Sequence, residues 1–143
     1  MTHINSGRIV LGGIVAAIVL FVVSGIVNGA ILGSAWQAWL EVMGSLNHAP
    51  AAFTGMVIWA VVSLVFGLTG VWIYAGIRPR YGAGWKTALL AGFLLWLAGW
   101  LAPSLGQVAL GAIPTYVTMV GAVGGLVAAL LALLAGASIY KET

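Results

Sequence analysis

The sequence predicts an all-α membrane protein in which four transmembrane helices form a single domain, residues 1–143. The first observation is composition: 63% of the residues are hydrophobic and only 5% are charged, whereas soluble domains carry about 25% charged residues. The second is the presence of four apolar stretches close to or above the roughly 20 residues that span a bilayer. The third is the grouping of the five basic residues on one side of the membrane once four spans are drawn. Together these observations exclude a soluble domain.

The first predicted span covers about residues 9–32 and follows Arg8. A basic residue before an apolar run is also typical of a cleaved signal peptide. The apolar core of a signal peptide is, however, only 7–15 residues long. Because this run is longer, we expect it to remain in the protein as a transmembrane helix.

A short amphipathic helix is predicted next, at about residues 34–46. Its apolar side chains recur at helical spacing and are Trp36, Trp39, Leu40, Met43 and Leu46. Its polar side chains lie on the other face and are Gln37, Glu41, Ser45 and, just beyond, His48. An apolar face rich in tryptophan favours a helix lying in the membrane interface, with the indole rings at the depth of the headgroups.

The second and third spans are predicted at about residues 53–77 and 85–102. Pro79 should end the second helix, because its ring blocks continuation of the helix, and the glycines of Gly82–Gly84 allow a tight turn. The third span is short and begins beside Lys86, whose long side chain can reach the headgroups. The uncharged segment 103–114 is expected to lie on the bilayer surface or to re-enter it. The fourth span follows at about residues 114–140.

The distribution of basic residues predicts the orientation in the membrane. All five lie at the same membrane side of the predicted spans, and the other two loops contain no Lys or Arg; they are Arg8, Arg78, Arg80, Lys86 and Lys141. An excess of Lys and Arg marks the cytoplasmic side. We therefore expect a multi-pass protein of the bacterial inner membrane with both termini in the cytoplasm. The same cluster is alternatively a binding site for an anionic lipid headgroup or a partner.

Few polar residues occur inside the spans, and they are Ser24, Asn28, Ser63 and Thr69. Serine and threonine can bond to carbonyls of their own helix. The amide of Asn28 carries more information, because an amide in hydrocarbon needs a partner. We expect it either to hold helices together or to line a path for a solute.

Small residues at a spacing of four predict faces for helix packing. In the first span they are Gly25, Gly29 and Gly33, and in the fourth Gly121 and Gly125. In lipid, small residues allow the close backbone approach that stabilises helix pairs. These faces serve either the packing of the four helices or contact with another subunit.

Residues for catalysis are nearly absent. There is no cysteine, and Glu41 and Glu142 are the only acidic residues. Glu41 and His48 are weak candidates for ligands at the outer surface, since two ligands without a third make a poor metal site. We expect no enzyme activity, no metal and no nucleic-acid partner. A bound lipid or apolar prosthetic group is left open as a cofactor.

The function predicted from these observations is that of a non-catalytic accessory or structural subunit of a larger membrane assembly. Its partners would be the lipid bilayer and either other membrane subunits or copies of itself. The first alternative is a homo-oligomeric channel or carrier for a small neutral or lipophilic solute. The second is an enzyme acting on lipid at the interface, for which Glu41 and His48 are the only support.

Overall fold

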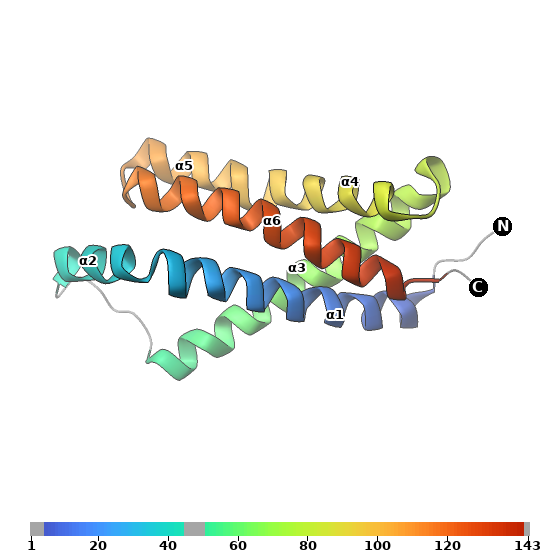
Figure 1. Ribbon diagram of the computed structural model, residues 1–143, viewed down its shortest axis with the longest axis horizontal. Coiled ribbons are helices and arrows are strands. Elements are labelled where there is room, and N and C mark those ends of the chain that lie inside the picture. Colours follow the sequence, from blue (N-terminus) through green and yellow to red (C-terminus); the bar gives the residue numbers. More distant parts are fainter. Residues whose placement is uncertain (1–4, 45–50, 142–143) are drawn as a thin grey trace.

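The protein is an all-α, four-helix membrane protein, as predicted. The computed structural model describes residues 5–44 and 51–141, and these residues form long helices joined by short turns (Figure 1). The four helical stretches long and apolar enough to cross a membrane are Ser6–Ile31, Ala52–Tyr81, Trp85–Leu110 and Thr115–Ile139. Even the shortest of them has 25 residues, which exceeds the length required to span the hydrocarbon.

The described residues form eight helical elements, and all of them except α2 belong to the four spans. In chain order these are α1 (Ser6–Gly25), η1 (Ile26–Ile31), α2 (Gly33–Met43), α3 (Ala52–Tyr81), α4 (Trp85–Trp96), η3 (Leu97–Leu101), α5 (Ala102–Leu110) and α6 (Thr115–Ile139). The first turn of α1 is capped by the Asn5 side chain, which accepts a hydrogen bond from the Arg8 amide. The first turn of α1, the last turn of α6 and the α3–α4 turn lie at one end of the molecule (Figure 1). The basic residues occur in these segments, so we call this the basic end and the opposite one the α2 end.

Helix α6 lies at the centre of the bundle, with α1 and α4 packed against it. Glycines allow these helices to approach closely. A Cβ added to Gly12 of α1 would lie 2.6 Å from the carbonyl oxygen of Gly136 in α6. One added to Gly92 of α4 would lie 2.9 Å from the carbonyl oxygen of Ala129. The bundle is thus held by backbone-to-backbone contact of the kind that stabilises helices in lipid.

Two spans contain a π-helical turn. In η1 the Leu32 amide donates to the Val27 carbonyl at 2.9 Å, and after η3 the Ala102 amide donates to the Leu97 carbonyl. Each bond reaches back five residues instead of four, which widens the helix locally.

The two π-helical turns flank the same glycine-rich part of α6. A Cβ on Gly124 would lie 2.5 Å from a methyl group of Val27 in η1, and one on Gly125 would lie 2.5 Å from the Trp100 ring in η3. Both turns therefore pack on α6 where it has no side chain to keep them away.

Two helices extend further than the sequence indicates. The third span continues through α5 to Leu110, so most of the predicted surface segment 103–114 is helical. Pro103 stands where the backbone hydrogen bonds change from the five-residue pattern of η3 to the four-residue pattern of α5. The regular series of hydrogen bonds is already interrupted at this point, so the missing N–H of proline costs little. Helix α3 likewise passes Pro79 and ends at Tyr81. Gly82 and Gly84 then turn the chain with φ angles of 84° and 132°, which only glycine adopts at low cost.

Helix α2 corresponds to the predicted amphipathic helix and ends at Met43. Trp36, Trp39 and Met43 are half-buried on one side, while Gln37 and Glu41 are exposed. Leu46 and His48, which the prediction included, lie outside the described residues.

Candidate functional site

The most unusual region is the first third of α3, which extends away from the rest of the bundle (Figure 1). Ala51–Val61, which we call the α3 arm, is exposed at every position except the half-buried Gly55. Three helical turns present all sides of a helix, so the described part of the chain buries no side of the arm, although Ala60 near its end faces α1. Phe53 is 76% exposed and Trp59 is 64% exposed.

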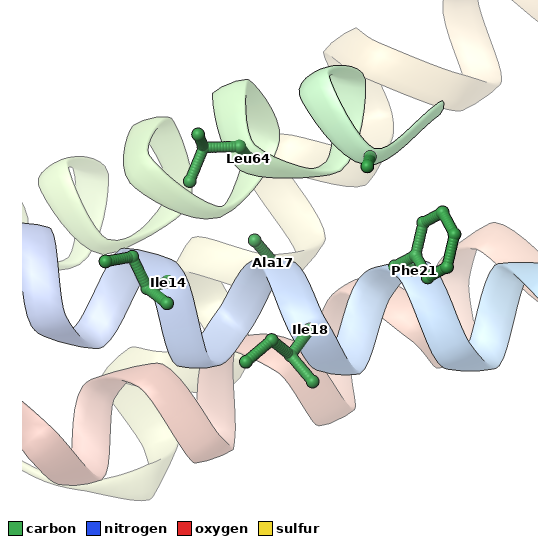
Figure 2. A pocket seen from close by; sticks show the side chains of 6 residues that line it. Ile14, Ala17, Ile18, Phe21 and Leu64 are labelled. Carbon is green, nitrogen blue, oxygen red and sulfur yellow. The ribbon is translucent and has the colours of Figure 1, made fainter. Parts of the chain in front are cut away.

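The arm separates from α1 at a shallow hollow of about 300 Å³. Its lining comes from both helices and consists of Ile14, Ala17, Ile18, Phe21, Ala60 and Leu64. Figure 2 shows Leu64 of α3 opposite Ile14 and Ala17 of α1. Every lining residue is apolar, so the hollow suits a hydrocarbon chain or an apolar side chain.

Below this hollow, towards the basic end, α1 and α3 are in direct backbone contact. A Cβ on Gly67 would clash with the Gly13 carbonyl and lie 2.7 Å from the Ala17 amide. A Cβ on Gly13 would lie 2.9 Å from the Leu68 Cα. These contacts fix an antiparallel register between the two helices.

If the same antiparallel register continues towards the α2 end, Gly25 lies at about the same height along the bundle axis as Val57. Gly29 then lies at about the same height as Phe53. The two helices diverge towards this end (Figure 1). A Cβ added to Gly25, Gly29 or Gly55 would meet no atom within 4 Å.

The glycines predicted to form packing faces therefore have different surroundings. Gly125 packs on Trp100, while a Cβ on Gly33 or Gly121 would reach its nearest neighbour only at 4.0 Å. Gly25 and Gly29 face open space within the chain. The glycines at which an added Cβ would meet the backbone of another helix within 3 Å are Gly12, Gly13, Gly67, Gly92 and Gly136. Three of them, Gly67, Gly92 and Gly136, also stand four residues after another small residue, so the spacing pattern includes them. These closely packed glycines have in common that they lie in the middle and basic-end parts of the spans.

The structure brings the exposed Asn28 to the half-buried Ser24, one turn before it in the first span. The Asn28 amide nitrogen donates to the Ser24 carbonyl at 2.9 Å, and its oxygen accepts from the Trp36 indole N–H at 3.2 Å. Asn28 thus joins its own helix to α2. Ser63 is buried and donates to the Trp59 carbonyl of its own helix at 2.9 Å, whereas Thr69 is exposed on α3.

Indole N–H groups tie other elements to the α2 end of the bundle. Trp39 of α2 donates to the Ala112 carbonyl in the α5–α6 turn at 3.2 Å. Trp96 of α4 donates to the Ala122 carbonyl of α6 at 2.7 Å. These bonds hold α2, α4 and α6 together at the α2 end of the bundle, where α3 has diverged from the other helices.

A second apolar groove, of about 480 Å³, lies between η1 and α6 and is open to the membrane. It is lined by Val27, Ile31, Met119, Val120, Val123, Gly124 and Val127. The groove has no polar side chain, so an acyl chain is the kind of molecule that it can accommodate.

The predicted anchoring residues gather at the basic end. Arg8, Arg80, Lys86 and Lys141 are exposed, and the Lys86 ammonium lies 5.6 Å from the centre of the Trp85 ring. Arg78 is half-buried, with its guanidinium 5.6 Å from the centre of the Tyr140 ring. The Tyr140 hydroxyl is buried and has no hydrogen-bond partner among the described residues. A rim of cations over aromatic rings suits a membrane interface.

The weak ligand pair of the sequence analysis is not assembled in the described residues. Glu41 is exposed on α2, and His48 lies outside the part that the structure describes. Residues 5–44 and 51–141 contain no group of three His, Cys, Asp or Glu side chains able to hold a metal. Comparison with protein-family models, curated proteins and solved structures finds no match.

Proposed function

We propose that the protein is a non-catalytic structural or accessory subunit of a larger membrane assembly, and that the α3 arm is its docking element. The observation that supports this role is the exposure of the arm. The first and third spans keep a helix neighbour near the α2 end, because η1 and η3 both pack on α6. Residues 5–44 and 51–141, in contrast, bury no residue of the arm.

The surface of the arm suits contact with another helix. Ala51 and Gly55 lie four residues apart, and Gly55 has open space around it. Small residues at this spacing let a neighbouring backbone approach, and in lipid this contact supplies much of the stabilisation of a helix pair. The large side chains of Phe53, Met56 and Trp59 add area for packing beside them.

The charge distribution supports an orientation with the basic end in the cytoplasm. The five basic residues border the spans at one end only, which is the arrangement of the positive-inside rule. We accordingly propose a bacterial inner-membrane protein whose α3 arm lies in the outer half of the bilayer. Lipid is the expected occupant of the groove between η1 and α6, and we propose no other cofactor.

The channel or carrier alternative has less support. The Asn28 amide is exposed and already bonded to the Ser24 backbone carbonyl and the Trp36 indole, and the Ser24 residue is half-buried. Both hollows described above are lined by apolar groups. A polar path would therefore have to be completed by additional copies of the chain.

The test is native mass analysis after gentle extraction from cells that express the tagged protein at a low level. We expect a complex larger than the monomer for the wild type and a loss of this complex for Trp59→Ala. Trp72→Ala is the matched control, because Trp72 lies on the same helix and is 63% exposed, against 64% for Trp59. A monomer in mild detergent, or equal loss of the complex in both variants, would contradict the proposal.

A further inference from the structure

We infer that the protein contains a hinge at the level of Gly124 and Gly125 of α6, about which the α2 end of the bundle turns as one body relative to the basic end. The inference goes beyond the proposed docking role and does not depend on it. Its basis is that the packed core divides at this level, and that each of the three spans crossing the division is irregular or rich in glycine there.

The buried apolar side chains of the described residues form two separate clusters. The larger cluster joins α1, α3, α4 and α6, and its buried members end at Leu20 in α1 and at Ala128 in α6. The smaller cluster lies at the α2 end and consists of Val27, Leu32 and Val117, with partly buried residues of α2 and α6 packed against it. Because side chains inside a close-packed cluster hold one another in place, each cluster defines a body that can move as a unit.

Hydrogen bonds also hold the α2 end together. The Trp36 indole N–H donates to the Asn28 side chain of η1 at 3.2 Å, and the Trp39 indole N–H donates to the Ala112 carbonyl at 3.2 Å. Both donors and both acceptors lie on the α2 side of the division, so bending at the hinge leaves these bonds intact. The α2-end body and the basic-end body consist, respectively, of residues 26–43 with 112–123, and of residues 6–25, 62–96 and 126–141.

Each of the three spans that cross the division has a weak segment there. The π-helical turn η1 begins at Ile26 and η3 ends at Leu101, and π-helical turns are an established cause of bends in helices. Helix α6 has three glycines within five positions, Gly121, Gly124 and Gly125, and glycine restricts the backbone less than any other residue. A few such residues are enough to absorb the change in backbone angles at a hinge.

The contacts across the division are of a kind that permits bending. Val27 and Trp100 pack on the two glycines of the hinge, where α6 has no side chain to interlock with them. The hydrogen bond that the Trp96 indole of the basic-end body donates to the Ala122 carbonyl of the α2-end body, at 2.7 Å, opposes the motion. This bond therefore acts as a latch between the two bodies.

Distances between spin labels test the hinge, because the chain has no native cysteine that would take up a label elsewhere. Two cysteines are introduced, labelled and measured by pulsed electron paramagnetic resonance in dioleoylphosphatidylcholine vesicles. The labelled protein is diluted with unlabelled protein, so that only distances within one chain are recorded. The pair across the hinge is Gln37→Cys with Gly76→Cys. Both positions are exposed, and Gly76 has open space around it.

Two control pairs each lie within one body. Gly76→Cys with Leu131→Cys reports on the basic-end body, and Gln37→Cys with Met119→Cys reports on the α2-end body. Leu131 is 46% exposed and Met119 is 44% exposed. We expect the distance distribution of the pair across the hinge to be about twice as wide as that of either control, because frozen samples retain the positions that a collective hinge motion visits.

Trp96→Phe tests the latch. It removes the indole N–H that bonds to the Ala122 carbonyl, so we expect the distribution across the hinge to broaden further while both control pairs keep their widths. Trp72→Phe is the matched control, since Trp72 is 63% exposed on α3, and it should leave all three distributions unchanged. A distribution across the hinge that Trp96→Phe does not alter would overturn the assignment of the latch.

The outcomes decide between a hinge, a rigid bundle and a mobile α2. A broad distribution across the hinge with two narrow controls supports the hinge. Equal widths for all three pairs overturn it. A broad distribution for the Gln37–Met119 pair also overturns it, because α2 would then move alone. None of these results depends on whether the α3 arm binds another subunit, so native mass analysis tests the docking role separately.

Discussion

The two parts of α3 have similar apolar composition but opposite surroundings. From Ser63 to Ala75 the helix contributes six buried residues to the bundle, which are Ser63, Gly67, Gly70, Val71, Tyr74 and Ala75. From Ala51 to Val61 it contributes none. The buried part presents small residues at Ser63, Gly67 and Gly70, whereas the arm presents Phe53, Met56 and Trp59.

The comparison shows that hydropathy does not decide which part of a membrane helix is covered. Lipid and protein are both apolar, so an apolar side chain gains little from exchanging one for the other. What differs is how closely another backbone can approach. Where α3 offers glycine and serine, α1 and its neighbours pack against it; where it offers large side chains beside a lone glycine, the described chain leaves it uncovered.

The largest expected effect on stability is that of Gly67→Ala, which disturbs the packing of the buried part of α3. The added Cβ would collide with the Gly13 carbonyl and the Ala17 amide, and backbone atoms cannot move aside as a side chain can. We expect the free energy of unfolding to fall by about 3 kcal/mol, at the upper end for overpacking. Denaturant titration in mixed micelles, followed by circular dichroism, measures this. Unchanged stability would mean that α1 and α3 do not approach as described.

Gly70→Ala should have an intermediate effect. Its Cβ would lie 2.8 Å from a methyl group of Leu133 and 3.0 Å from one of Leu95. Methyl groups at the ends of leucine side chains can rotate away, so we expect a loss of about 1 kcal/mol in the same titration. A loss as large as that of Gly67→Ala would show that the leucines at the centre of the bundle cannot adjust.

Gly55→Ala should have the smallest effect and the opposite sign. The position is helical and open, so alanine should raise the stability of the dilute, monomeric chain by roughly 0.5 kcal/mol through its better helix propensity. The same titration applies, in excess detergent. A clear loss of stability would show that the arm packs against its own chain and would remove the contrast between the two parts of α3.

The sequence predicted the number, type and order of the spans because these follow from composition and run length. Helix ends were less accurate. Pro79 and Pro103 are strong breakers in isolation, yet α3 continues two residues past Pro79, and the third span accommodates Pro103 beside a π-helical turn. A π-helical turn depends on tertiary packing and has no simple sequence pattern, so the additional length of the third span could not be predicted.

The candidate site was only partly accessible from sequence. Gly25 and Gly29 were identified as a packing face, but their separation from α3 depends on where two helices diverge, which no single helix encodes. Asn28 was expected to need a partner, and the structure supplies Trp36 as one. The exposure of the arm could not be inferred from the sequence, because every side of the span is apolar and exposure depends on the positions of the other helices.

The π-helical turn η1 also determines how the first span would tolerate the loss of a residue. Each residue of an α-helix advances the chain by about 100° around the axis, and η1 accommodates one residue more than a regular turn. The extra residue is taken up inside η1, so the loss of a single residue between positions 26 and 31 would turn this segment into regular α-helix and leave the residues after it at about the same angular position. The loss of a residue from the regular part of α1 would instead rotate η1 and α2 by about 100° relative to the rest of the bundle. That rotation would turn the Trp39 indole away from the Ala112 carbonyl.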